Sequence, residues 1–169
     1  VAHNAVSNMK LGSGIAPIPE LLTAGALVSI GTDGPASNNT LDMFREMRIV
    51  ALLHKVNKLN PTVLPATEVL KMATVNGAKA LGLDNVGEIK VGYKADLILV
   101  DLNRASLTPA HNPISLLVYS ADGYSVDTMF VDGNLIMENG KIQTLDEAKI
   151  RERGQKQAED LLERAGVSV

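Results

Sequence analysis

The chain has 169 residues, of which 46% are apolar and 21% charged, the composition of an ordinary globular protein with enough residues for a hydrophobic core. Its formal net charge of −3, with mixed signs, excludes the basic footprint of a nucleic-acid-binding protein, and no apolar run approaches the roughly 20 residues that span a bilayer. There is no cysteine, which excludes disulfides and thiolate metal sites. We therefore expect a cytoplasmic protein that binds neither nucleic acid nor membranes.

The first part of the chain predicts a loop, a short helix and a buried strand. Residues 1–14 are rich in Asn, Ser and Gly, which is typical of a loop. A helix is expected over residues 20–24, because Pro19 needs no backbone donor at an early position and Gly25 suits a left-handed stop. Residues 27–30 are apolar and partly β-branched, which indicates a buried strand.

Two longer helices are predicted next. Apolar residues recur at helical spacing over residues 41–56, and Asn39 or Thr40 can cap the first amides of this helix. A further helix is expected over residues 65–81, interrupted by the Asn-Gly pair at 76–77. The order of helix, strand, loop, helix and helix is the rhythm of an α/β unit.

Beyond Leu83 the pattern changes to short strands. Residues 95–101 form a turn-bounded apolar run, and residues 124–132 alternate in polarity before the hairpin turn Asp132-Gly133 leads into residues 135–137. A second turn is expected at Asn139-Gly140. The chain then ends in a charged amphipathic helix over residues 146–164, whose mixed signs and lack of aromatics favour a solvated or partner-covering face.

Asp33 is the strongest candidate for chemistry. It follows the buried strand directly, at the end where parallel α/β folds place their active sites, and Gly31 and Gly34 leave room for an ion or ligand. Its carboxylate is a hard oxygen donor that suits Zn²⁺ and can also accept a proton from water. The alternative is that Asp33 only shapes a turn, because Asp-Gly is a common turn pair.

Several stretches, in the same order, resemble the last barrel segments of the amidohydrolase superfamily. Its closest branch is the 5-methylthioadenosine/S-adenosylhomocysteine deaminases, with guanine deaminase and the triazine hydrolases as relatives. Ala5 departs from the family, which usually has proline there, but that proline shapes a loop and does no chemistry. The stretches that carry the resemblance are His3-Asn4 with residues 7–14, residues 31–39, residues 41–44, and the pattern Gly87-x-Ile89-x-x-Gly92-x-x-Ala95-Asp96-Leu97.

The resemblance implies an α/β fold in three segments. Residues 1–83 would be the C-terminal strands and helices of a (β/α)8 metal-dependent hydrolase barrel, residues 84–145 part of a small β-sandwich domain, and residues 146–169 a C-terminal helix. A full barrel takes about 250 residues, so this chain cannot hold one. Because it opens with Val1 and no initiator methionine, we expect a cut within a longer protein. The missing N-terminal barrel half or a second copy of the chain would then cover its exposed faces.

The resemblance also implies a mechanism. Asp33 would bind a divalent ion, Zn²⁺ or another, and exchange a proton with the attacking water while ammonia leaves a purine nucleoside such as 5-methylthioadenosine or S-adenosylhomocysteine. The other metal ligands of the family are upstream histidines, including a His-x-His pair, and this sequence has no such pair. Since catalytic zinc needs about three protein ligands, we expect the chain to be inactive alone. A guanine deaminase, a triazine hydrolase and a non-catalytic α/β binding module remain the alternatives.

The three histidines are weaker candidates. His3 lies in the predicted loop and is expected to stabilise it rather than to contact a ligand. His54 is placed on the polar side of its helix and is expected to be solvated. His111 precedes Asn112-Pro113 and is expected to fix a turn.

Four further polar residues have alternative readings. Ser37 and Asn38 could bind substrate from the loop after Asp33, but capping the next helix is the more economical role for them. Arg45 and Arg48 share a helix with Asp42 and Glu46, which predicts a surface ion-pair face.

Overall fold

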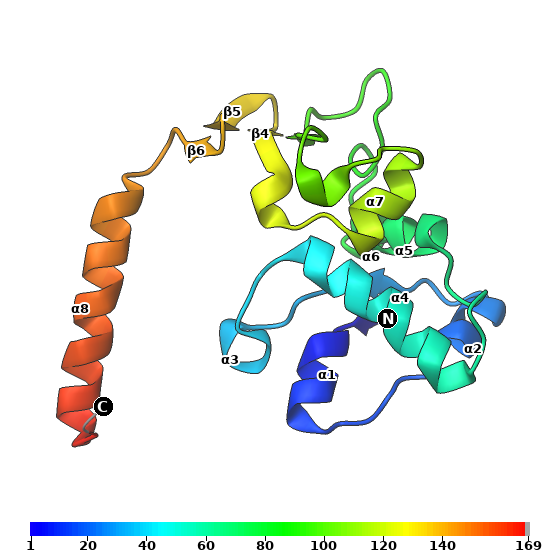
Figure 1. Cartoon of the computed structure of the whole chain (residues 1–169), viewed down its shortest axis with the longest axis horizontal. Helices are drawn as coiled ribbons and strands as arrows, with labels where there is room; N and C mark the ends of the chain where they lie inside the picture. Colours follow the sequence, from blue (N-terminus) through cyan, green and yellow to red (C-terminus); the bar gives the residue numbers. More distant parts are fainter. Residues whose placement is uncertain (168–169) are drawn as a thin grey trace.

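The computed structural model describes residues 1–167, and it confirms the mixed α/β class (Figure 1). The first half of the chain is mainly helical. Its elements are β1 (Ala2–His3), α1 (Ala5–Leu11), α2 (Ile18–Thr23), β2 (Ser29–Ile30), α3 (Pro35–Asn38), α4 (Met43–Lys58), α5 (Ala66–Ala73) and α6 (Val75–Ala80). The second half contains β3 (Leu97–Val100), the 3-10 turn η1 (Ala105–Leu107), α7 (Pro113–Tyr119), the 3-10 turn η2 (Gly123–Ser125), β4 (Val126–Val131), β5 (Asn134–Glu138), β6 (Lys141–Ile142) and α8 (Glu147–Ala165).

The strands β1 and β2 form a short parallel pair, in which Ala2 lies opposite Ser29 and His3 opposite Ile30. Both Ser29 and Ile30 are buried, as predicted for this apolar run. Because the strands are parallel, their carboxyl ends lie side by side, and the segments that follow His3 and Ile30 leave from this same end of the pair. The start of α1 therefore lies beside the Asp33 loop.

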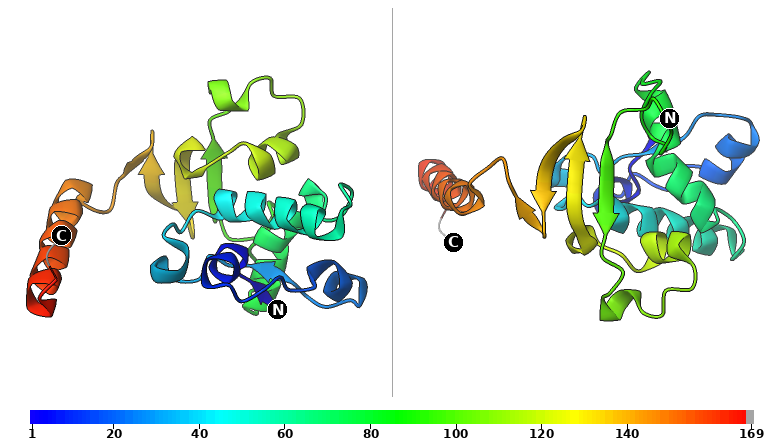
Figure 2. Two further views of the ribbon diagram at one scale, coloured as in Figure 1. Left: turned by 60° about the horizontal axis from the view of Figure 1, so that its bottom comes forward. Right: turned by 90° about the horizontal axis from the view of Figure 1, so that it is seen from above.

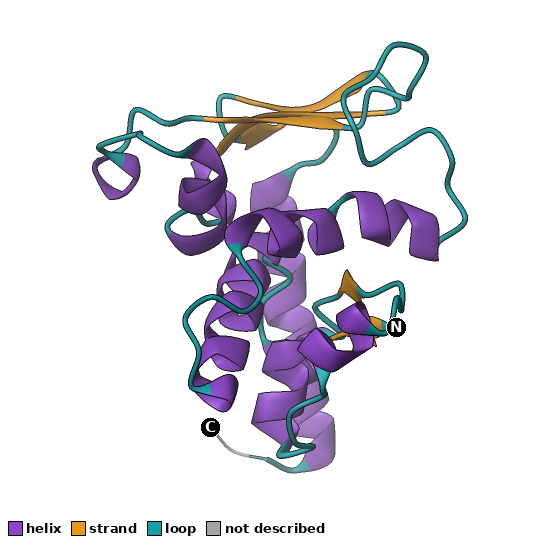
Figure 3. Ribbon diagram, turned by 90° about the vertical axis from the view of Figure 1, so that its right-hand side faces the viewer, coloured by secondary structure: helices purple, strands orange, loops and turns teal. Residues whose placement is uncertain are grey.

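The other four strands form an antiparallel sheet in the order β3-β4-β5-β6, which lies as a layer across one end of the molecule in Figure 3. The predicted hairpin turns are confirmed. Asp132 and Gly133 have φ values of 49° and 78°, and Asn139 and Gly140 have values of 51° and 69°. Left-handed backbone at both central positions matches the twist of a tight hairpin, and Asp, Asn and Gly tolerate it better than other residues.

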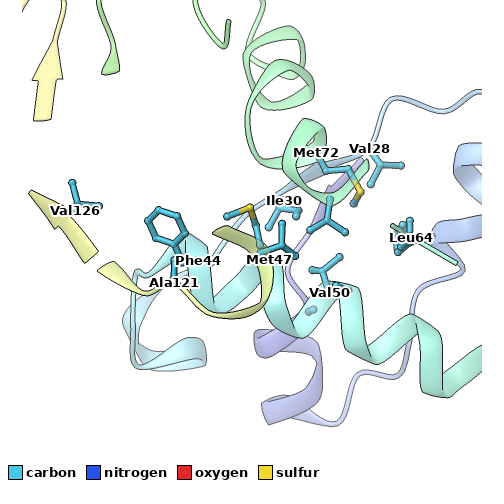
Figure 4. Packing of buried hydrophobic residues seen from close by; sticks show 14 of the residues in the cluster. Val28, Ile30, Phe44, Met47, Val50, Leu64, Met72, Ala121 and Val126 are labelled. Carbon is cyan, nitrogen blue, oxygen red and sulfur yellow. The ribbon is translucent and has the colours of Figure 1, made fainter. Parts of the chain in front are cut away.

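The hydrophobic core is built on α4. Phe44, Met47 and Val50 recur on one face of this helix and are nearly fully buried. Figure 4 shows Met47 beside Ile30 of β2, and Phe44 farther along α4 beside Ala121. The same cluster extends to residues on either side of η2, so it joins the helical half of the chain to the sheet.

The helix α8 lies apart from the other elements in Figure 1 and in Figure 2, and none of its residues is buried. Its start is capped by Asp146, whose side chain accepts a hydrogen bond from the Lys149 amide, close to the predicted start. The last two residues of the predicted 146–169 segment lie outside the described residues. Between residues 1 and 167, no helix is both long enough and apolar enough to cross a membrane.

Three local predictions were wrong. Residues 1–14 are not all loop, because β1 and α1 occupy most of them. The cap of α4 is neither Asn39 nor Thr40 but Asp42, whose Oδ1 accepts from the amides of Phe44 and Arg45 at 2.9 and 3.3 Å. The break in the following helix falls at Thr74, between α5 and α6, and the Asn-Gly pair at 76–77 lies inside α6.

Candidate active site

Asp33 lies three residues beyond the carboxyl end of β2. The segment that leads into α1 starts from the adjacent carboxyl end of β1. Its φ of 59° is in the left-handed region, which Asp adopts more readily than most residues. The residue is exposed. At the nearby Gly31, an added Cβ would lie 2.5 Å from Asn4 Oδ1, so a larger residue there would displace the Asn4 side chain.

Two serine hydroxyls hold the Asp33 carboxylate. Ser7 Oγ of α1 donates to Asp33 Oδ2 at 2.7 Å, and Ser37 Oγ of α3 donates to the same oxygen at 2.6 Å. The hydrogen bonds from Ser37 and then Ser7, together with a backbone hydrogen bond from Gly34, lower the pKa of Asp33. The carboxylate is therefore an ionised acceptor at neutral pH, and neither serine occupies Oδ1.

The role of Ser7 was missed from the sequence, because it stands 26 positions from Asp33. The role predicted for Ser37 also needs correction. Its hydroxyl turns back to Asp33 and to the Gly34 carbonyl, at 2.6 and 3.0 Å, and not forward to the next helix. A second link between α1 and the loop comes from Lys10, whose Nζ donates to the Ala36 carbonyl at 2.9 Å and to Asn39 Oδ1.

A buried carboxylate lies behind this loop. Glu46 of α4 is only 1% exposed, so its predicted place on a surface ion-pair face is wrong. Its Oε1 accepts from the Val6 amide and its Oε2 from Asn38 Nδ2, both at 3.0 Å. Burial raises the pKa of Glu46, while the hydrogen bonds from Val6, Asn38 and Ala5 oppose this shift. Asn38 also donates to the Thr32 carbonyl at 2.7 Å, so it does not cap α4 as predicted.

The structure brings His3 and His54 together in the core. They are 2% and 0% exposed, and their Nε2 atoms are 3.0 Å apart, so one ring donates a hydrogen bond to the other. The prediction of a loop residue and a solvated residue was therefore wrong for both. Burial, followed by the charge of His54, lowers the pKa of His3 to about 4, and burial also lowers the pKa of His54.

The remaining candidates are peripheral. Arg45 Nε lies 3.3 Å from Asp42 Oδ2, three residues away, and the pair of an exposed arginine with a half-buried aspartate keeps part of the predicted ion-pair face. Arg48 is exposed. His111 is also exposed, and its amide donates to the Pro109 carbonyl at 3.2 Å, as expected of a turn that precedes α7.

An apolar cavity of about 710 Å³ lies between the helices α4 to α6 and the strand β3. Met47, Leu70, Ile89, Leu97 and Leu117 are among its lining residues, and Asp33 is not. Since the lining offers few polar groups, we do not assign chemistry to this cavity.

The side chains of residues 1–167 can supply only part of the ligand set of a metal ion. They include no group of three His, Asp or Glu side chains that could hold an ion together. Among the candidates singled out above, Asp33 offers an exposed, ionised carboxylate with an oxygen free of serine contacts. Such a group fits one position in a zinc site, whose remaining ligands would have to come from outside these residues.

The fold is that of an α/β metal-dependent hydrolase. Residues 1–136 match the family model described as "Amidohydrolase family", and the chain belongs to this family. Among curated proteins, it is 57% identical over 164 residues to a 5′-deoxyadenosine deaminase of Methanosarcina barkeri, covering 97% of this chain and 38% of that protein. It is 52% identical to a 5-methylthioadenosine/S-adenosylhomocysteine deaminase of Dictyoglomus thermophilum, covering 98% of this chain and 39% of that protein.

Solved structures give the same picture. The fold superposes with a TM-score of 0.92 on an adenosine deaminase from Xanthomonas campestris with bound zinc, at 38% identity, covering 95% of this chain and 37% of that one. It also matches an atrazine chlorohydrolase from Arthrobacter aurescens complexed with zinc, with a TM-score of 0.85 at 30% identity, covering 92% of this chain and 35% of that one. The chain thus spans less than two fifths of the length of each of these four relatives.

Proposed function

We propose that the chain is the C-terminal part of a zinc-dependent deaminase of purine nucleosides such as 5-methylthioadenosine, S-adenosylhomocysteine or 5′-deoxyadenosine. The observation that carries the proposal is the Asp33 carboxylate, held ionised by Ser7 and Ser37 beside the end of β2. It is supported by identities above 50% to proteins named as such deaminases, over nearly the whole chain. We place the protein in the cytoplasm, with a small nucleoside as its ligand.

In this proposal the chain has three segments. Residues 1–83 supply the last strands and helices of a (β/α)8 barrel, with β1 and β2 as neighbouring barrel strands. Residues 84–145 belong to a small β-sandwich beside the barrel, and the third segment, which starts at residue 146, contains the terminal helix α8. The barrel segments outside this chain would cover the apolar side chains that are exposed on residues 1–83, such as Leu41, Leu59 and Leu81.

The metal would be shared between Asp33 and ligands outside the chain. When bound, a divalent ion lowers the pKa of water towards ~7 and so supplies a nucleophile at neutral pH. Asp33 would take up the proton of the attacking water on its carboxylate, while the new C–O bond forms at the ring carbon that carries the amine and the π electrons of its C=N bond shift to the ring nitrogen. As the C–N bond to the amine breaks, these electrons would re-form the C=N bond and Asp33 would pass the proton to the leaving nitrogen, which gives ammonia and the hydroxy tautomer of a hypoxanthine ring.

The serines prepare Asp33 for this exchange. Because both hydroxyls donate to Oδ2, they fix the rotation of the carboxylate and favour its charged form. Oδ1 accepts from neither serine, so its lone pairs remain open to the metal ion and to the proton. A positioned base of this kind typically contributes about 10²–10⁴-fold to a rate.

The test is the activity of the complete protein that contains this chain. We expect ammonia release from 5-methylthioadenosine or 5′-deoxyadenosine with a kcat/KM at least about tenfold above that for guanine, because a nucleoside site rejects a bare base through polar groups left unpaired. The likeness to an atrazine chlorohydrolase makes a triazine hydrolase the second candidate, and chloride release from atrazine without deamination would favour it. Binding of a nucleoside without turnover of any of these compounds would instead indicate a non-catalytic module.

A further inference from the structure

Glu46 is a buried residue of α4 that supports the Asp33 loop from its inner side. Within residues 1–167 it forms no hydrogen bond with Asp33 itself. Among the residues that Glu46 binds are Val6 and Asn38, and each of these two is the sequence neighbour of a serine that donates to Asp33. On one side Val6 precedes Ser7, and on the other Asn38 follows Ser37. The buried carboxylate of Glu46 therefore binds both of the segments whose serines donate to the exposed carboxylate of Asp33.

The contacts of Glu46 require an acceptor on both oxygens. The Val6 amide and the Asn38 side-chain amide are both N–H donors, at 3.0 Å from Oε1 and Oε2 respectively. No Lys or Arg forms a salt bridge with Glu46 among the residues that the structure describes. A buried carboxylate without a counter-ion is expensive to keep, and its hydrogen bonds must compensate for the lost water.

Glu46 also replaces a local helix cap. The N-cap residue of α1, Asn4, makes no side-chain capping hydrogen bond, and Glu46 reaches across from α4 to bind the amide of Val6 in the first turn. A negative charge is favoured at this end of a helix. The orientation of α1, and with it the direction of the Ser7 hydroxyl, is thus set by a residue 40 positions away.

Asn38 transmits the same constraint to the other side of the loop. Its Nδ2 donates both to Glu46 Oε2 at 3.0 Å and to the carbonyl of Thr32 at 2.7 Å. Thr32 directly precedes Asp33, whose left-handed backbone is otherwise uncommon for a residue with a Cβ. Glu46 and Asn38 together thus stabilise the backbone conformation at Thr32 and Asp33.

We propose that Glu46 is a positioning residue for Asp33, acting through Val6-Ser7 and Ser37-Asn38. This inference rests on the proposed function for its effect on catalysis, but its structural part stands on the geometry alone. Glu46→Gln is the sharpest perturbation, because glutamine has the same shape but offers an N–H₂ group where a second acceptor is needed. One of the two links to the serine-bearing segments is then lost.

The experiment compares the wild-type complete protein with Glu46→Gln at saturating zinc. We expect kcat on the purine nucleoside to fall about tenfold or more with KM changed less than about threefold, because displacement of a reacting group by about 1 Å can lower a rate by 10²-fold. The matched control is Asp42→Ala on the same helix, which removes the α4 cap and lowers the melting temperature without reaching either serine. It should leave kcat within about twofold of wild type, since capping affects stability and not the Asp33 loop.

A crystal structure of Glu46→Gln supplies a readout that does not depend on activity. We expect at least one of the two serine hydrogen bonds to Asp33 Oδ2 to lengthen beyond hydrogen-bond distance. If both are retained, or if kcat is unchanged in an active wild-type background, Glu46 does not position Asp33. A wild-type protein without deaminase activity overturns the proposed function alone, and the crystal structure then still decides the inference. Should Glu46→Gln fail to fold, Asn38→Ala takes its place, with the same kcat and crystallographic criteria for support and for rejection.

Discussion

The buried histidine pair predicts that the fold loses stability in mild acid. His3 and His54 share one hydrogen bond between their Nε2 atoms, and the Nδ1 atom of each ring is buried without a hydrogen-bond partner among residues 1–167. A proton added to either ring would place a charge in the core where little can solvate it. The charged groups that act on His54 are Glu20 of α2 and Lys58 of α4, which form a partly exposed ion pair. Glu20 raises the pKa of His54 and Lys58 lowers it, so their effects oppose each other.

The size and sign of the effect follow from the pKa of His3. Its fall from 6.5 in a free histidine to about 4 in the folded chain corresponds to about 3 kcal/mol of stability. Because the folded state favours the neutral ring, this contribution is fully present above about pH 6.5. It is lost progressively as the pH falls from about 6.5 to about 4, where the unfolded chain binds the proton and the folded chain does not.

The assay is urea unfolding of the chain by circular dichroism at a series of pH values, compared with the double variant His3→Leu/His54→Leu. Replacing both partners with apolar groups leaves no polar atom unpaired, so we expect the variant to fold. Carboxylates titrate in both proteins, so the difference between them isolates the pair. We expect the wild type to lose about 3 kcal/mol more than the variant between pH 6.5 and 4. His111→Gln, which changes an exposed histidine, should behave as wild type. Equal losses in the wild type and the double variant would mean that the histidine pair does not cause the loss of stability in acid.

Three further predictions concern the cap of α4, a glycine motif and the isolated chain. Asp42→Ala should lower the free energy of unfolding by about 1–2 kcal/mol in urea titrations, because the amides of Phe44, Arg45 and Gly123 lose their acceptor; an unchanged value would contradict the capping role. Gly87→Ala should lower the free energy of unfolding by about 1–3 kcal/mol, because the φ of Gly87 is +90° and a Cβ would lie 3.0 Å from that of Ala78. Gly92→Ala is the control: its φ is +88° but a Cβ there would meet open space, so only the smaller effect of backbone strain is expected. The isolated chain mixed with zinc and 5-methylthioadenosine should release no ammonia, because it offers fewer than the about three ligands that catalytic zinc needs; measurable ammonia would overturn this expectation.

Much of the fold could be predicted where the signal is local. The turns at Asp132-Gly133 and Asn139-Gly140 were found because left-handed backbone demands particular residues, whatever lies elsewhere in the chain. The buried strand β2 and the helix α4 were found from apolar periodicity. The helix α1 was missed because its residues favour a loop locally, and the group that binds its first turn is Glu46 on another helix.

The candidate site was predictable only in part. The position of Asp33 after an apolar run was visible, but the serine from α1 that holds it is brought there by the parallel pairing of β1 and β2. His54 lies on the same face as Phe44, Met47 and Val50, so its spacing already indicated burial. It was assigned to solvent because of its polar type, which overlooked that a partner such as His3 can satisfy a buried imidazole.

Asp33 is the proposed metal ligand of this chain, and the metal content of the complete protein shows whether it binds the ion. After dialysis against a weak chelator, the wild type should retain about one divalent ion per chain by elemental analysis. Asp33→Asn should retain at least about tenfold less, since a neutral amide is a poor substitute for a carboxylate ligand. Asp96→Asn, an exposed acidic residue of the β segment, serves as the matched control and should keep its metal. Equal metal content in the wild type and Asp33→Asn would contradict the account.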